Sequence, residues 1–283
     1  MKIAIRDASL EPKSPEDLKE KMELVDVNIF ELYIKKDITT AWGENVLFPD
    51  KQEELAVMLS KLKLKICAGL VESHLANKDC EPEIDYVVKA SQVLLGLGVK
   101  ILRIDVTSNE PDNAKDWQEY LPIAVKVVNE CLLRTEKLGV EFAVENHGTI
   151  TNKIEFLRAL LKEVNSPRLG LTLDTANFYW YGYPLSEVYN IFEEFAPYVK
   201  HVHIKNINYP ESEQEKTRQI GWEYGKYMSL LSQGNINMEK VVKILKKAKF
   251  KNALCIENES VNSKPIENRI EILKNDVEFL KQI

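Results

Sequence analysis

Cysteine and histidine are scarce in this chain, which has only four of each among 283 residues. The cysteines, Cys67, Cys80, Cys131 and Cys255, lie far apart and form no CxxC pair. This spacing argues against a disulfide framework or a thiolate metal site and favours reduced thiols. Apolar runs of ~18 residues are also missing, and MKIAIRDASL lacks the apolar stretch of a signal peptide. We therefore expect a cytoplasmic protein without a membrane partner.

Positive charge does not predominate either. The formal net charge is −6 at pH 7, with 38 Lys and Arg against 44 Asp and Glu. Because binding to a phosphate backbone depends on Lys and Arg displacing counterions, nucleic acid is not an expected partner. A hydrophobic content of 45% and a charged content of 29% are typical of a globular chain with a sizeable core.

Short β-branched runs alternate with longer amphipathic stretches, which is typical of repeated βα units. Eight strands are predicted, at residues 3–7, 27–34, 64–70, 99–105, 140–146, 169–174, 199–205 and 252–258. Ser14 and Pro15 have the pattern of a helix start, and Gly139 closes a long helical stretch. With a last helix over 266–282, this order predicts an α/β fold, a single (β/α)₈ TIM barrel domain spanning 1–283. An open doubly wound sheet is disfavoured because no GxGxxG motif follows the first strand.

Metal-competent side chains stand at the carboxyl ends of the last four predicted strands. Glu145 ends the fifth strand in FAVENHG, and the next three strands end in Asp174, His203 and Glu257. TIM-barrel enzymes carry their chemistry at this end of the barrel, and side chains alternate along a strand, so these four converge if they point inward. Three carboxylates and one imidazole suit one divalent ion, Mn²⁺ foremost. Mg²⁺ and Co²⁺ are alternatives, and Zn²⁺ is less favoured without thiolates.

Three further polar residues near these strand ends are predicted to contact a substrate. His147 is placed to bind substrate or the strand-five carboxylate, with a structural turn contact as the alternative. Lys205 shares the orientation of the strand-seven ligand, although many strand-end lysines are solvated, and Asn177 offers an amide to a hydroxyl. His201 lies one dipeptide deeper and is expected to be a hydrogen-bonded core histidine.

The chain resembles the xylose-isomerase-like barrels, a superfamily of sugar isomerases and epimerases that also includes inosose dehydratases and apurinic endonucleases. The likeness lies in the ExH-type end of strand five, LDTANF on strand six, HVHIK on strand seven and IENE on strand eight. The resemblance implies that Glu145, Asp174, His203 and Glu257 are metal ligands, with Glu145 and Glu257 also exchanging protons. The chain departs from the ketose epimerases at Tyr209, where they have an arginine, so their sugar contacts do not transfer.

These features together predict a divalent-metal-dependent isomerase or epimerase that acts on a sugar or sugar derivative by proton transfer through an enediolate. An inosose-type dehydratase is the alternative, because loss of a β-hydroxyl uses the same kind of site. An apurinic-type endonuclease and a non-catalytic sugar-binding barrel are less favoured. The long aromatic-rich segment 203–234 is predicted to fold over the substrate. The identity and phosphorylation of the substrate and a homo-oligomeric state stay open.

Overall fold

The strands form a closed parallel barrel. The computed structural model describes residues 1–77, 79–107 and 116–283. Each strand pairs with the next one along the chain, and the last pairs with the first. The strands are β1 (Ile3–Arg6), β2 (Ile29–Tyr33), β3 (Lys65–Leu70), β4 (Ile101–Ile104), β5 (Glu141–Glu145), β6 (Leu169–Asp174), β7 (Val199–Ile204) and β8 (Leu254–Ile256). The predicted (β/α)₈ barrel is therefore confirmed.

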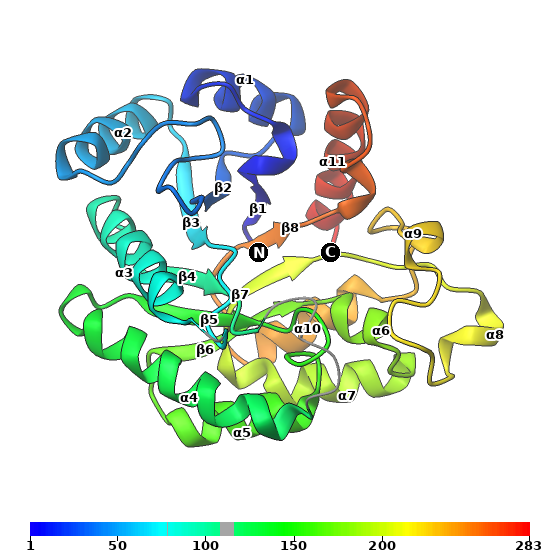
Figure 1. The fold of residues 1–283 in the computed structure, drawn as a ribbon. Coiled ribbons are helices and arrows are strands. Elements are labelled where there is room, and N and C mark those ends of the chain that lie inside the picture. The colour runs from blue at the N-terminus through cyan, green and yellow to red at the C-terminus, as the bar shows by residue number, and fades with distance from the viewer. Residues whose placement is uncertain (78, 108–115) are drawn as a thin grey trace.

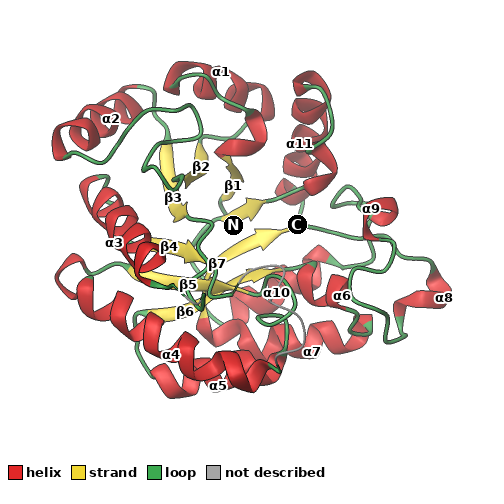
Figure 2. Ribbon diagram, in the orientation of Figure 1, coloured by secondary structure: helices red, strands yellow, loops and turns green. Residues whose placement is uncertain are grey.

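The long helices form the outer layer around the barrel, and the short ones lie in segments that follow the strands (Figures 1 and 2). They are α1 (Pro15–Val25), α2 (Pro49–Lys61), α3 (Glu81–Gly96), α4 (Trp117–Arg134), α5 (Ile154–Val164), α6 (Asn177–Tyr181), α7 (Leu185–Phe195), α8 (Glu211–Gln214), α9 (Tyr224–Tyr227), α10 (Met238–Lys247) and α11 (Ile266–Lys281). Short 3-10 helices lie at Asp7–Leu10, Glu136–Leu138, Ala196–Tyr198 and Glu259–Val261. Within the described part of the chain, none of the helices has both the length and the apolarity that crossing a bilayer requires.

Local sequence signals account for several of these boundaries. Ser14 accepts a hydrogen bond from the amide of Asp17 at the start of α1, and Pro15 is the first helical residue, as predicted. Gly139 has a φ of 65°, the left-handed conformation that glycine adopts without strain, and it turns the chain into β5. The predicted last helix agrees with α11 within one residue at its end.

Alternation along the strands separates two environments. On β8, Leu254 and Ile256 belong to the large apolar core between the sheet and the helices. Between them, Cys255 packs inside the barrel with Ala4 and Ala253 in a small separate cluster. Burying each large aliphatic side chain of the outer core stabilises the fold by about 1.5–3 kcal/mol. The inward positions are thus left to small and polar residues, and the polar ones gather at the carboxyl ends of the strands.

Candidate metal centre

Four metal-competent side chains meet at the carboxyl end of the barrel. Glu145 and Asp174 are the last residues of β5 and β6. His203 lies one residue before the end of β7, and Glu257 directly follows β8. One donor atom from each lies within 4.8 Å of the others, and all four residues are buried. The structure therefore brings together the residues that the sequence motifs indicate.

Three of the atoms that face one another in this cluster lack a hydrogen-bond partner. His203 Nδ1 lies 3.2 Å from Glu145 Oε2 and 3.0 Å from Glu257 Oε2. Even so, His203 Nδ1, Asp174 Oδ2 and Glu257 Oε2 are buried without a hydrogen bond. Buried polar atoms are nearly always paired, so three unpaired atoms that converge indicate a binding site. A divalent cation fits this donor set, because carboxylate oxygens and imidazole nitrogens are common ligands of such ions.

Backbone amides orient the Asp174 carboxylate toward the cluster. Its Oδ1 accepts hydrogen bonds of 2.8 Å from the amides of Ala176 and Asn177, where α6 begins. The amide of Asp174 donates to Asn146 Oδ1 at 2.8 Å. With Oδ1 held in this way, Oδ2 faces the other three side chains. Burial, together with the charges of Glu257 and Glu145, raises the pKa of Asp174 to about 7 even though the charge of Lys205 lowers it.

Two arginines that no motif indicates neutralise the glutamates. Arg103 on β4 donates to Glu145 and to Asp105, and Arg6 on β1 donates to Glu257. Burial alone would raise the pKa of Glu145, but the charge of Arg103 contributes to lowering it below its ordinary value. These arginines come from the half of the barrel that supplies none of the four clustered side chains. Their signal in the sequence is a charged residue at an inward position of an otherwise apolar strand.

Lys205 is buried beside the same cluster. Only 4% of its surface is exposed, so the solvated position left open for this residue is excluded. Its Nζ lies 3.2 Å from Asp174 Oδ2 and 2.7 Å from Glu259 Oε1. The other oxygen of Glu259 accepts a hydrogen bond of 2.6 Å from the Tyr224 hydroxyl. Lys205 thus links the cluster to residues farther along the chain, and a contact with substrate stays a prediction.

A pocket of about 420 Å³ opens next to the cluster. Its lining residues are His147, Gly148, Thr149, Asn177, Trp180, Ile220, Tyr224 and Glu259. Asn177 joins the pocket to the cluster, because its Nδ2 donates a hydrogen bond of 3.3 Å to Glu145 Oε1. Trp180 is the tryptophan that lines this pocket, and its indole offers a flat apolar surface to a bound molecule.

His147 pairs with an aspartate that the sequence motifs do not indicate. Its Nδ1 lies 3.0 Å from Asp105 Oδ1, which replaces the predicted alternative of a hydrogen bond to Glu145. Its amide also donates to Thr151 Oγ1 at 2.9 Å, the kind of turn contact that was left open. Burial opposes protonation of the imidazole, but the hydrogen bond and charge of Asp105 raise the pKa of His147 above its ordinary value.

His201 is buried, as expected of a core histidine, but neither of its ring nitrogens makes a hydrogen bond. Its Nε2 lies 2.9 Å from Oε1 of Glu31, a fully buried glutamate on β2. Glu31 also contacts His203, and with Cys255 these residues form a second group whose donor atoms lie within 4.8 Å of one another. No motif indicates Glu31. Its signal is the single carboxylate in the run VNIFELYI.

The long segment after β7 is folded against α6. Arg218 donates to the carbonyl of Lys216 at 3.0 Å, of Tyr179 at 2.9 Å and of Tyr183 at 3.1 Å. Its guanidinium carbon also lies 4.4 Å from the ring centroid of Tyr179 and 4.6 Å from that of Tyr209. Because residues of this segment line the pocket, the segment forms part of the pocket wall. Tyr209 itself is buried in this aromatic contact.

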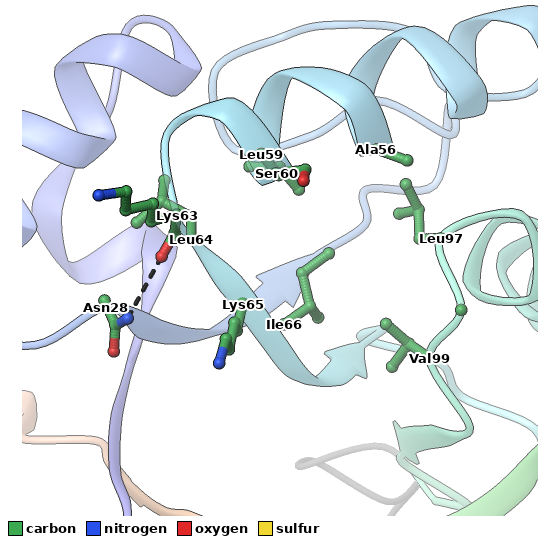
Figure 3. A pocket seen from close by; sticks show the side chains of 11 residues that line it. Asn28, Ala56, Leu59, Ser60, Lys63, Leu64, Lys65, Ile66, Leu97 and Val99 are labelled. Atoms are coloured by element: carbon green, nitrogen blue, oxygen red, sulfur yellow. Dashed lines mark hydrogen bonds between the residues drawn. The ribbon is translucent and has the colours of Figure 1, made fainter.

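Another cavity, of about 720 Å³, lies at the opposite end of the strands (Figure 3). It is lined where β3 begins and where the chain approaches β4, by Asn28, Ala56, Leu59, Ser60, Lys63, Leu64, Lys65, Ile66, Leu97, Gly98 and Val99. Apart from two lysines, these side chains are apolar or uncharged. In barrel enzymes this end of the strands serves stability, so we place the chemistry at the cluster of carboxylates instead.

Comparison with known proteins agrees with the architecture. A family model described as "Xylose isomerase-like TIM barrel" matches residues 24–283, and the chain therefore belongs to that family. No curated protein sequence matches the chain.

Solved structures with the same fold cover nearly the whole chain. The IolI protein with a bound zinc atom has a TM-score of 0.75 at 18% identity, covering 99% of this chain and 98% of that one. AsbF from Bacillus anthracis, described as a probable 3-DHS dehydratase, has a TM-score of 0.71 at 16% identity and covers 99% of both chains. D-psicose 3-epimerase in the presence of D-fructose has a TM-score of 0.70 at 12% identity, covering 100% of this chain and 99% of that one. At such identities the likeness shows a common fold.

Proposed function

We propose that this protein is a divalent-metal-dependent isomerase or epimerase of a sugar or sugar derivative. The observation that carries the proposal is the buried cluster of three carboxylates and one imidazole, three of whose facing atoms make no hydrogen bond, next to a pocket. The pocket volume of about 420 Å³ lies in the range of small-molecule sites. Similarity in fold to D-psicose 3-epimerase and to zinc-containing IolI supports the proposal.

The ion would be held by Glu145, Asp174, His203 and Glu257. When bound, a divalent cation supplies Lewis-acid polarisation of a substrate carbonyl. We propose Mn²⁺ as the preferred ion on the donor chemistry, because carboxylates predominate. The zinc atom in IolI makes Zn²⁺ the first alternative to test.

Glu145 and Glu257 are the proposed proton-transfer groups. A carboxylate that removes the proton beside a carbonyl leaves an enediolate. Return of the proton to the opposite face of that carbon gives the epimer, and delivery to the neighbouring carbon gives the isomer. Because Glu145 Oε1 contacts the pocket residue Asn177, we assign the first proton transfer to Glu145. His147, Asn177 and Lys205 would hold the hydroxyl groups of the substrate.

A dehydratase is the second candidate, and the His147–Asp105 pair favours it. Loss of a β-hydroxyl requires a proton donor at the leaving oxygen, and an imidazole held by a carboxylate on a pocket wall suits that role. AsbF, a probable dehydratase, shares the fold. The two candidates differ in their products: an isomer has the mass of the substrate, and a dehydration product has lost one water.

The test is proton exchange in D₂O. A panel of ketoses, aldoses and cyclic polyol ketones is incubated with Mn²⁺-loaded protein, and products are followed by NMR and mass spectrometry. An isomerase or epimerase should incorporate deuterium at the carbon beside the carbonyl. Glu145→Gln should lower kcat by roughly 10²–10⁴-fold, because the amide cannot accept the proton.

Glu141→Gln is the matched control. Glu141 lies on the same strand but at its amino end, where it pairs with Lys200. It should therefore turn over at the wild-type rate. Normal turnover and label incorporation in Glu145→Gln would contradict the assigned role, and an unlabelled product would point to hydride transfer. A product that has lost water would establish the dehydratase.

A further inference from the structure

Glu31 contacts the edge of the His203 ring that is turned away from the proposed ligands. His203 Nε2 lies 3.0 Å from Oε1 and 3.1 Å from Oε2 of this carboxylate, with hydrogen-bond geometry. Both side chains are fully buried. On the other side of the same ring, Nδ1 lies 3.2 Å from Glu145 Oε2 and 3.0 Å from Glu257 Oε2. The imidazole is therefore held between one carboxylate from β2 and the cluster from β5 to β8.

This arrangement determines which ring nitrogen of His203 carries the proton and which one keeps a lone pair. A neutral imidazole has one protonated nitrogen and one lone pair, and only the lone pair can bind a cation. A carboxylate is an acceptor, so Glu31 selects the ring form with the proton on Nε2. The lone pair of His203 Nδ1 is then directed at Glu145 and Glu257. Metal-binding histidines are commonly oriented by such a carboxylate.

Further contacts keep the Glu31 carboxylate in place. His201 Nε2 lies 2.9 Å from its Oε1, and Arg6 Nε lies 3.7 Å from its Oε2. Arg6 also donates to Glu257, so it ties Glu31 to one of the ligands. A buried carboxylate without such partners would be costly, and here two imidazoles and one guanidinium surround it.

We propose that Glu31 is a positioning residue of the metal centre, which fixes His203 with its proton on Nε2 and its Nδ1 lone pair toward the ion. The inference rests on the metal centre of the proposed function. It assigns a role to β2, a strand that supplies none of the four ligands.

An alternative occupant of this region is a second metal ion. Glu31, His201, His203 and Cys255 have donor atoms within 4.8 Å of one another. The hydrogen-bond geometry between His203 Nε2 and both oxygens of Glu31 disfavours a second metal ion. A nitrogen that carries a proton has no lone pair left to bind a cation. The experiment below separates the two.

Metal affinity provides the first measurement. Glu31→Gln keeps the size of the side chain but removes its charge, and removal of such a partner typically weakens metal binding about 10–100-fold. Asp7→Asn is the matched control, because Asp7 is also fully buried but accepts hydrogen bonds from the amides of Ala8 and Tyr33. Its Kd for Mn²⁺ should stay at the wild-type value. Circular dichroism shows whether both variants fold.

The histidine ring form provides the second measurement, on the wild-type chain. With four histidines in the sequence, long-range ¹H–¹⁵N spectra can resolve each ring. In the Zn²⁺-loaded protein His203 should carry its proton on Nε2 and bind through Nδ1. A proton on Nδ1, or an unchanged Kd in folded Glu31→Gln, would overturn the inference while leaving the metal centre intact. Two ions per chain, one of them lost in Cys255→Ser, would make Glu31 a ligand and also overturn it. A wild-type chain without metal affinity would refute the proposed function and this inference together.

Discussion

Arg218 should determine whether the segment after β7 stays closed against α6. Arg218→Ala removes the donors to the carbonyls of Tyr179 and Tyr183, at 2.9 and 3.1 Å, the donors to carbonyls within the segment itself, and the stacking on two tyrosine rings. A hydrogen bond from a charged donor contributes about 1.5–3 kcal/mol when buried, and a cation–π contact about 0.5–2 kcal/mol. Arg218 is half-buried, so water replaces part of these contacts in the variant. We therefore expect the free energy that holds the segment against α6 to fall by roughly 3 kcal/mol. The barrel strands make none of these contacts.

Hydrogen exchange measured by mass spectrometry tests this loss of free energy in the segment itself. Since 1.4 kcal/mol corresponds to a factor of ten, peptides from residues 206–234 should exchange roughly 100-fold faster in Arg218→Ala, while β5 peptides stay unchanged. Gly182→Ala should act in the same direction, because an added Cβ would lie 2.2 Å from the Arg218 carbonyl oxygen. Arg134→Ala is the control, since Arg134 forms several ion pairs at an exposed position. Unchanged exchange in Arg218→Ala would refute the assigned role.

Three further outcomes are expected. Burial raises the pKa of Asp7 to about 8, so the folded chain keeps a proton that the unfolded chain releases near pH 4, and stability falls between these values by up to ~1.4 kcal/mol per pH unit. Asp7→Asn should therefore gain melting temperature relative to wild type as pH rises through this window; a constant difference would contradict the sign. Trp180→Ala should raise KM by roughly 10-fold with a smaller change in kcat, because Trp180 lines the pocket and is not one of the four clustered residues. Oligonucleotides with an abasic site should be cleaved no faster by wild type than by Asp174→Ala, and metal-dependent cleavage would favour the endonuclease alternative.

The strand pattern made the fold and the proposed ligands predictable. Side chains alternate along a strand, so the apolar positions that face the helices show which positions point into the barrel. A polar residue at an inward position of a strand end therefore indicates a site residue. Glu145, Asp174 and His203 each follow an outward apolar residue, and the barrel closes their strands side by side. The structure brings them together for that reason.

The supporting charges could not be assigned from the motifs. Glu31 and Arg103 stand alone among apolar residues on β2 and β4, which signals buried charge but does not identify a partner. Glu31 meets His203 from across the barrel, at a sequence distance of 172 residues. Likewise, two of the carbonyls that Arg218 binds, those of Tyr179 and Tyr183, lie in α6 and shortly after it, and no local pattern encodes that contact.

The most direct test of the account is the metal content of the purified protein. Wild type, exchanged against Mn²⁺ or Zn²⁺ and analysed by inductively coupled plasma mass spectrometry, should hold about one ion per chain, since the four proposed ligands have donor atoms within 4.8 Å of one another. His203→Ala should lose this ion, because the change removes the only nitrogen from the donor set, whereas His74→Ala should retain it. One ion per chain in wild type and none in His203→Ala would support the metal centre. Stoichiometric binding that survives His203→Ala and Asp174→Ala, or no binding in wild type, would contradict it.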